Sequence, residues 1–228
     1  MDKICVIVAA GSVDTMCFNA FVSNYKNIYY IAVDGGYAHL KEQGIVPALV
    51  VGDFDSLGYV PEDTKVVKHP VMKDQTDMLL AIDEAVKAGF LQVYVLGALG
   101  GERLDHTIAN LQMLSYAKGK GCNAVILDKA TCAFVITKEL HINEAGVIAD
   151  NSELFDKNII QELSSGSRYL SLLSYSNETT GISIKGCKYE LENADMNNAY
   201  PLGVSNEITS DNVCISLKNG MLLVILIS

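Results

Sequence analysis

The sequence predicts an α/β N-terminal domain with a parallel sheet, followed by an all-β sandwich domain. In the first half, short apolar runs alternate with segments whose apolar residues recur at helical spacing, as in a parallel sheet covered by helices on both faces. After about residue 130, short strand-like runs are separated by turn residues, which indicates an antiparallel sandwich or barrel. We therefore place the domains at 1–130 and 131–228, with their junction between 128 and 165.

Six short apolar runs in the N-terminal half are predicted to be strands. Most of them are followed by glycine or by acidic residues, which mark the point where a strand gives way to a loop. In an open parallel sheet, ligands bind beyond the carboxyl ends of the strands, near the point where the strand order reverses. The predicted strands are 4–10, 28–33, 48–51, 65–68, 93–96 and 124–127.

Helices are predicted between these strands. The clearest one, 74–88, has apolar residues at helical spacing and stops at Gly89. Another, 105–118, is expected to bury a stripe through Leu104, Ile108, Leu111 and Leu114. The other two segments with helical character are 11–24 and 37–43.

The C-terminal half reads as short strands between turns. Asn219-Gly220 is a strong hairpin signal. Residues 143–163 fit no regular pattern, and a short helix and an insertion both remain open for 151–163. The predicted strands are 132–137, 169–173, 181–185, 189–191, 213–217 and 221–227.

Composition excludes several classes of function. The chain of 228 residues has a net charge of −10, whereas nucleic-acid binding requires Lys and Arg to contact phosphates. A phosphorylated small molecule can still bind if a divalent cation screens the carboxylates. The six cysteines form no Cys-x-x-Cys pair, which disfavours zinc and fits reduced thiols in the cytoplasm. No apolar run reaches the length of a membrane span, so we expect neither a nucleic-acid nor a membrane partner.

Acidic residues follow two of the predicted strands. Asp53 and Asp55 come directly after the run 48–51, and Asp34 follows 28–33. Residues two apart on a strand point the same way, with Cα atoms roughly 6.5 Å apart. Asp53 and Asp55 could thus hold one Mg²⁺ together, or act as a ligand and a base. The competing interpretation is a polar turn.

Two further acidic groups lie near helix starts. Asp74 and Asp77 are three residues apart, and Asp105 follows Arg103 just after the glycines of the 97–101 loop. Capping accounts for Asp74 and Asp105 but leaves Asp77 less explained. Arg103 is either a phosphate ligand or an ordinary surface residue, and no P-loop or Gly-x-Gly-x-x-Gly fingerprint is present.

Together these motifs resemble the thiamine pyrophosphokinase family. In the N-terminal half the resemblance rests on Asp-Gly-Gly at 34–36, Gly-Asp-Phe-Asp-Ser at 52–56, Lys-Asp-Gln-Thr-Asp at 73–77 and Gly-Gly-Glu-Arg-Leu-Asp-His-Thr-Ile-Ala-Asn at 100–110. In the C-terminal half it rests on 179–181, 186–191 and 203–207. Two features depart from the family pattern: Cys187 stands where leucine is usual, and the stretch 143–163 is longer and less regular.

The resemblance implies a homodimer, with the active site at the subunit interface, that transfers the diphosphate of ATP to the hydroxyl of thiamine and releases AMP. It also implies Mg²⁺ as cofactor. The implied catalytic residues are Asp53, Asp55, Asp74, Asp77, Arg103 and Asp105. Of these, Asp53, Asp55, Asp77 and Asp105 are the implied metal ligands, and Asp55 and Asp77 are the leading candidates for the general base.

The resemblance also assigns the two substrate sites. The implied ATP-binding residues are Asp34, Gly35, Gly36, Lys73, Thr76 and Asn110. The implied thiamine-binding residues are Ser183, Tyr189, Ser205 and Asn206.

Two other classes of function remain open on the sequence. The same acids would serve a metal-dependent phosphohydrolase or nucleotidyltransferase, and the same motifs would serve a thiamine- or nucleotide-binding protein without turnover. The C-terminal Tyr189 and Ser205-Asn206 favour the kinase over a hydrolase, which needs no aromatic thiamine site.

Overall fold

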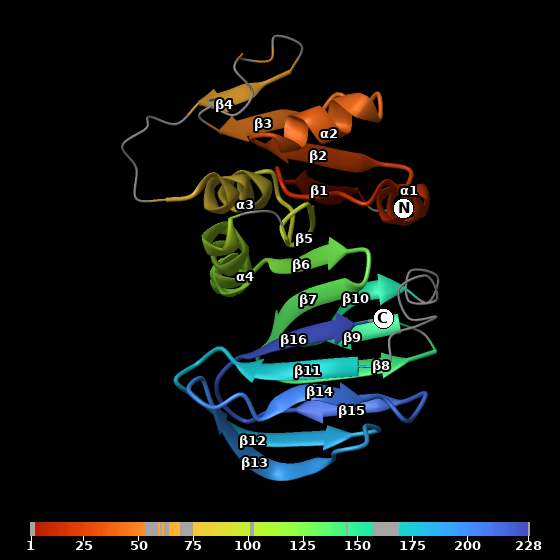
Figure 1. Cartoon of the computed structure of the whole chain (residues 1–228), viewed down its shortest axis with the longest axis vertical. Helices are drawn as coiled ribbons and strands as arrows, with labels where there is room; N and C mark the ends of the chain where they lie inside the picture. The colour runs from red at the N-terminus through yellow and green to blue at the C-terminus, as the bar shows by residue number, and fades with distance from the viewer. Residues whose placement is uncertain are drawn as a thin grey trace. The chain divides into compact units, whose positions relative to one another are not determined.

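The computed structural model describes residues 3–52, 59, 61, 64–68, 75–100, 103–144, 146–156 and 169–227. The predicted site residues Asp53, Asp55, Lys73 and Asp74 lie outside these ranges. The chain divides into two compact units, Met1–Lys129 and Ala130–Ser228 (Figure 1). The first unit alternates strands and helices and the second contains strands alone in its described part, so the predicted fold class is confirmed.

The first unit is built on a parallel sheet with the strand order β6-β5-β1-β2-β3-β4. Its strands are β1 (Ile4–Val8), β2 (Ile28–Val33), β3 (Leu49–Gly52), β4 (Val66–Lys68), β5 (Gln92–Leu96) and β6 (Asn123–Asp128). The connecting helices are α1 (Thr15–Ser23), α2 (Gly36–Glu42), α3 (Asp77–Lys87) and α4 (Leu104–Gly119).

The central strand β1 explains why the sequence signal is strong in this unit. Cys5, Val6, Ile7 and Val8 are all fully buried, because helices cover both faces of the sheet. Such a strand appears in the sequence as a continuous apolar run. Burial also raises the pKa of the Cys5 thiol, which keeps this cysteine in its neutral form.

The starts of two helices differ from the prediction. Helix α3 begins at Asp77 and not at Asp74, because the Thr76 side chain caps it by accepting a hydrogen bond from the Leu79 N–H. Helix α4 begins at Leu104, and Asp105 lies within its first turn and not at the cap. The interpretation of Asp105 as the cap of α4 is therefore wrong, and Asp74 lies outside the described residues.

The predicted apolar stripe of α4 is also only partly correct. Leu104 and Ile108 are 69% and 49% exposed, whereas Met113 and Leu114 in the C-terminal half of the helix are buried. Helix α4 packs against β6 and α3 through that C-terminal half. Its first turns extend beyond the core, so the helical spacing of Leu104 and Ile108 does not indicate burial.

The second unit consists of antiparallel strands in two sheets, the sandwich predicted from the sequence. One sheet has the order β14-β11-β16-β7, with β7 (Thr131–Ile136), β11 (Tyr169–Ser174), β14 (Gly203–Glu207) and β16 (Leu222–Ile227). The other has the order β10-β9-β8-β15-β12-β13, with β8 (Glu139–Asn143), β9 (Gly146–Ala149), β10 (Ser152–Asp156), β12 (Glu178–Lys185), β13 (Leu191–Asn197) and β15 (Val213–Ser216).

The described part of the irregular stretch 143–163 is a β-hairpin. Strands β9 and β10 pair across a two-residue loop, Asp150-Asn151, with φ angles of 49° and 64°. Two central residues with positive φ match the twist of a tight hairpin, and Asp and Asn tolerate this conformation. The Asp150 carboxylate accepts hydrogen bonds from Thr137, Lys138 and Glu139, which attaches the turn to the β7–β8 connection. The helix interpretation is therefore wrong for 151–156, the described part of 151–163.

Two other predictions in this unit need correction. Tyr189 lies in the connection between β12 and β13, and the strand predicted at 189–191 begins at Leu191 instead. Asn219-Gly220 is not a hairpin, because it joins β15 of one sheet to β16 of the other. Gly220 still has the positive φ, 99°, that its turn signal implies.

Gly36, the first residue of α2, provides a test of the packing in the first unit. A Cβ atom added at Gly36 would lie 1.9 Å from the Val8 carbonyl oxygen, so α2 can pack against β1 only without a side chain. We expect Gly36→Ala to lower the free energy of unfolding by about 1–3 kcal/mol or more. The measurement is urea denaturation followed by circular dichroism.

Gly119→Ala is the matched control, because nothing lies within 4 Å of a Cβ added at this end of α4. Alanine is favoured over glycine in helices by up to about 1 kcal/mol, so this variant should be as stable as the parent or slightly more stable. Equal stability of Gly36→Ala and the parent would contradict the close approach of α2 to β1.

Candidate active site

A pocket of about 510 Å³ opens at the carboxyl ends of β1, β2 and β5. β1 pairs with β2 on one side and with β5 on the other, although β5 comes later in the chain. The strand order therefore reverses at β1, which is where open α/β sheets bind their ligands. The volume lies within the usual range for small-molecule pockets, about 300–1,000 Å³.

One side of this pocket is lined by the main chain of the segments after β1 and β5, which carry no large side chains. The Ala9 N–H donates to the Leu96 carbonyl at 2.8 Å, and the Gly11 N–H donates to the Gly97 carbonyl at 2.9 Å. Gly97 has a φ of 67°, and a Cβ atom there would lie 2.6 Å from the Ala9 carbonyl oxygen. The segments after β1 and β5 are thus in direct contact, and only small residues fit between them.

Helix α4 forms another wall of the pocket and holds the loop after β5. Asn110 donates from Nδ2 to the Ala98 carbonyl at 2.8 Å, and the Thr107 hydroxyl donates to the Gly100 carbonyl at 3.4 Å. The loop therefore lies beside the first turns of α4. A glycine-containing loop near a helix N-terminus is suited to bind anions, because main-chain N–H groups there point outward.

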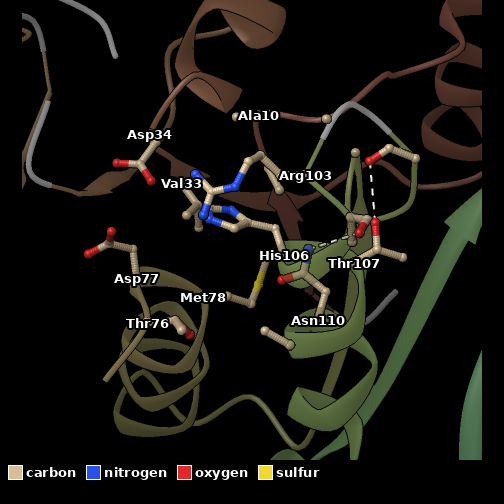
Figure 2. A pocket seen from close by; sticks show the side chains of 16 residues that line it. Ala10, Val33, Asp34, Thr76, Asp77, Met78, Arg103, His106, Thr107 and Asn110 are labelled. Atoms are coloured by element: carbon tan, nitrogen blue, oxygen red, sulfur yellow. Dashed lines mark hydrogen bonds between the residues drawn. The ribbon is translucent and has the colours of Figure 1, made fainter. Parts of the chain in front are cut away.

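Asp34 and Asp77 bring carboxylates to one end of the pocket (Figure 2). Asp34 follows β2 with a φ of 49°, and its main-chain N–H donates to the Val51 carbonyl at 3.0 Å. Its buried Oδ1 lies over Gly52, where an added Cβ atom would be 2.0 Å away. Asp77 approaches from the first turn of α3. The side chains of Arg103 and His106 extend toward these acids from the other wall.

Arg103 is paired with Asp105. Its Nε and one terminal nitrogen donate to the two carboxylate oxygens at 2.9 and 2.6 Å, which is a bidentate geometry. These hydrogen bonds lower the pKa of Asp105 to about 2 and raise that of Arg103. Both side chains are about two-thirds exposed, so the pair orients Arg103 more than it stabilises the fold.

The pocket gathers some of the residues that the sequence predicts for one site. Gly35 and Gly36 lie beside it at the start of α2, and Asp105 is engaged by Arg103 outside the lining. The predictions for Asp53, Asp55, Lys73 and Asp74 fall outside the described residues. The predicted residues that line the pocket are Asp34, Thr76, Asp77, Arg103 and Asn110.

Sequence reasoning missed the residues that contribute main chain to the pocket. Ala9, Ala10 and Gly11 after β1 line it, together with Thr107 of α4, whereas Ala98 lies in the 97–101 loop that the sequence already places after a strand. The position of Ala9–Gly11 at the end of a buried strand was the available signal. Small residues carry no chemical pattern of their own, so only the positional rule could have found them.

The described residues include no group of three or more His, Cys, Asp or Glu side chains that could hold a metal by themselves. Asp34 and Asp77 still supply hard oxygen donors at one end of the pocket. Mg²⁺ usually takes one or two carboxylates, with phosphate oxygens and waters completing its octahedron. The donor chemistry therefore fits Mg²⁺ bound together with a polyphosphate.

The residues predicted for thiamine lie in the second unit. The Tyr189 side chain is exposed, whereas Asn206 is buried and hydrogen-bonded to the Tyr189 main chain. Ser205 has a φ of 58°, and its N–H donates to the Ser171 hydroxyl. The Ser183 hydroxyl accepts from the Asn193 N–H at 3.2 Å. The structure thus brings Tyr189 and Asn206 together and bonds Ser183 to strand β13.

This fold, an α/β unit followed by an antiparallel sandwich, is shared by crystal structures of thiamine pyrophosphokinases. The structure from Bacillus subtilis has a TM-score of 0.78 at 24% identity and covers 100% of this chain and 99% of its own. The structure from Geobacillus thermodenitrificans has a TM-score of 0.77 at 25% identity and covers 99% and 97%.

The sequence comparisons give the family. A model described as the thiamin pyrophosphokinase catalytic domain matches residues 22–126, and one described as its vitamin B1 binding domain matches 157–222. The thiamine pyrophosphokinase of Bacillus subtilis is 29% identical over 88% of this chain and 87% of its own length. Thiamin pyrophosphokinase 1 of Caenorhabditis elegans is 25% identical over 86% and 78%. The chain belongs to the thiamine pyrophosphokinase family.

The Arg103–Asp105 pair predicts the pH range in which the Asp105 carboxylate loses its charge. Because the pKa of Asp105 is lowered from 3.8 to about 2, its carboxylate should remain ionised at pH 3 and lose its charge only as the pH falls through about 2. In Arg103→Ala the Asp105 midpoint should rise toward 3.8. NMR titration of the side-chain carboxyl carbons measures both midpoints.

Lys87→Ala is the control, because it removes an ion pair on α3 with Glu84 and leaves Asp105 untouched. An Asp105 midpoint that is the same in the parent and in Arg103→Ala would contradict the pairing.

Proposed function

We propose that the protein transfers the diphosphate group of ATP to the hydroxyl of thiamine, giving thiamine diphosphate and AMP. The observation that carries this proposal is the convergence of Asp34, Asp77 and Arg103 at the switch point of the sheet. These residues come from three separate motifs of one family, and both domain models of that family match the chain in order. Neither a phosphohydrolase nor a binding protein without turnover is supported by the comparisons.

The proposed reaction is an in-line displacement at phosphorus. The thiamine hydroxyl attacks the β-phosphorus of ATP, the bond to the α-phosphate oxygen breaks, and AMP leaves. Most of the catalytic effect in such a transfer comes from positioning the groups and neutralising charge. A carboxylate of the site acts as the general base and takes the proton of the thiamine hydroxyl. Asp55 and Asp77 are the candidates for this base. Asp77 lines the pocket from the start of α3, and this position supports it as a candidate.

A divalent cation, for which we propose Mg²⁺, would neutralise polyphosphate charge and polarise the reacting phosphoryl oxygens. Asp53, Asp55 and Asp77 are its proposed ligands, and the donor set gains Asp34 from the described pocket. Asp105 is also a predicted ligand, but both of its oxygens accept from Arg103, which favours a role in orienting that arginine.

Positive charge and the remaining polar residues complete the proposed nucleotide site. Arg103 and Lys73 would counter phosphate charge, and Thr76 would face the nucleotide from the pocket wall. Gly35 and Gly36 would contribute indirectly by letting α2 approach β1. Asn110 would hold the loop after β5 through its bond to the Ala98 carbonyl.

Thiamine is proposed to bind at Tyr189, Ser205, Asn206 and Ser183 of the second unit. The Tyr189 ring is 63% exposed, and an aromatic face attracts a cation such as the thiazolium of thiamine.

We also propose a homodimer with the active site at the subunit interface. We further propose a cytoplasmic location, which the scattered cysteines support because no two of them form a Cys-x-x-Cys pair. No helix within the described ranges is long and apolar enough to span a membrane.

The proposed function is tested by incubating the purified protein with ATP, Mg²⁺ and thiamine. We expect thiamine diphosphate and AMP in equal amounts by mass spectrometry, and neither product without thiamine. Chelation should abolish turnover and added Mg²⁺ should restore it, because the acidic pocket requires a cation to accept a polyphosphate. AMP or phosphate release without thiamine would indicate a hydrolase, and full activity in excess chelator would contradict the metal site.

The variant Asp77→Asn tests whether Asp77 has a catalytic or a structural role. We expect kcat to fall about 100-fold or more, comparable to losing one preorganised charge-stabilising group. The melting temperature should change little, because Thr76 and not Asp77 caps α3. Glu84→Gln is the control on the same helix, since it removes a carboxylate paired with Lys87 outside the pocket and should keep full activity. Normal turnover by Asp77→Asn would exclude it from the site.

A further inference from the structure

The connection after β12 pairs antiparallel with the last residues of β14 and the chain that follows them. The Thr209 N–H donates to the Gly186 carbonyl at 3.1 Å, and Cys187 forms a bridge with Ile208. The Lys188 N–H then donates to the Glu207 carbonyl at 2.8 Å. The next pair in this register is Tyr189 with Asn206.

At Tyr189 a side chain replaces the main chain as the pairing group. The Tyr189 N–H donates to the Asn206 Oδ1 at 2.9 Å, and the Asn206 Nδ2 donates to the Tyr189 carbonyl at 2.8 Å. The main chain at Asn206 is instead opposite Leu170 of β11. The Asn206 amide therefore acts as a substitute peptide group that extends the register by one residue.

Burial and backbone conformation hold Asn206 in this role. Asn206 is only 5% exposed, whereas the Tyr189 side chain that it supports is 63% exposed. Immediately before Asn206, Ser205 has a φ of 58°, and its N–H donates to the hydroxyl of the buried Ser171 at 3.0 Å. The amide is thus directed inward at the main chain of Tyr189 and presents little surface to a ligand.

We propose that Asn206 is a positioning residue that fixes the main chain of Tyr189, so that the exposed ring is held ready for thiamine. This inference rests on the proposed function and changes the predicted role of Asn206 from a thiamine contact to a support for one. Holding a binding side chain in place before the ligand arrives improves affinity, because less conformational freedom is lost on binding. Asn206 then influences thiamine only through Tyr189.

A double-mutant cycle tests this dependence. Tyr189→Ala should raise the KM for thiamine about 5- to 100-fold through the loss of stacking and cation–π attraction. Asn206→Ala should raise it by a smaller factor. In the Tyr189→Ala background, Asn206→Ala should add nothing, because residues that act as one unit are not additive. The KM for ATP should not change in any variant.

Thr209→Val is the matched control. It removes a side-chain hydrogen bond to the Gly186 carbonyl at the other end of the same register, and it leaves the pair of Tyr189 and Asn206 intact. We expect its thiamine KM to equal that of the parent. Hydrogen–deuterium exchange supplies a readout independent of turnover: the Tyr189 amide should exchange faster in Asn206→Ala than in the parent or in Thr209→Val.

The outcomes distinguish this inference from the proposed function. A parent protein that forms no thiamine diphosphate would overturn the proposed function, whatever the exchange data show. With an active parent, losses that multiply in the double variant would show that Asn206 contacts thiamine itself, and would overturn the positioning role. Unchanged exchange at Tyr189 in Asn206→Ala would overturn it as well.

Discussion

The first unit depends on how closely three stretches of main chain meet at the carboxyl end of β1. A Cβ atom at Gly36 would collide with the Val8 carbonyl, and one at Gly97 with the Ala9 carbonyl. Gly11 is hydrogen-bonded on both sides, through its N–H to the Gly97 carbonyl and through its own carbonyl to the His39 ring. Larger residues at these positions would separate α2 and the loop after β5 from β1. The main chain after β1 and β5 can therefore line the pocket directly.

The close approach of these main-chain segments determines which elements supply the charged groups of the pocket. Because the segments after β1 and β5 contribute main chain and small residues, the charged groups come from Asp34, Asp77 and Arg103 at the ends of β2, α3 and α4. Helix N-termini favour anions, whereas the carboxylates disfavour them. A polyphosphate can bind near the helix N-termini and beside the carboxylates only if a cation lies between the phosphates and the carboxylates. The proposed metal therefore follows from the charge balance of the pocket, and not from a ready-made ligand cage.

The sequence was most informative where one physical rule determines the structure. The buried run of β1 and the placement of Asp34 beyond β2 both follow from a parallel sheet covered on two faces. Periodicity misled at Ile108, because helical spacing does not reveal whether a turn of helix extends beyond the core. The hairpin at Asp150-Asn151 was missed although its turn residues are favourable, because the flanking runs are short.

The two asparagines of the predicted site form hydrogen bonds that their sequence motifs do not reveal. Asn110 and Asn206 are both predicted to bind a substrate, and each donates from its side-chain amide to a main-chain carbonyl, of Ala98 and Tyr189 respectively. An amide side chain is suited to this task because it carries both a donor and an acceptor, as a peptide group does. Tyr189 and Asn206 are 17 residues apart in the chain, so their pairing cannot be recognised before the fold is known. A motif thus marks residues that a site requires, and the structure adds which main-chain groups their side chains bind.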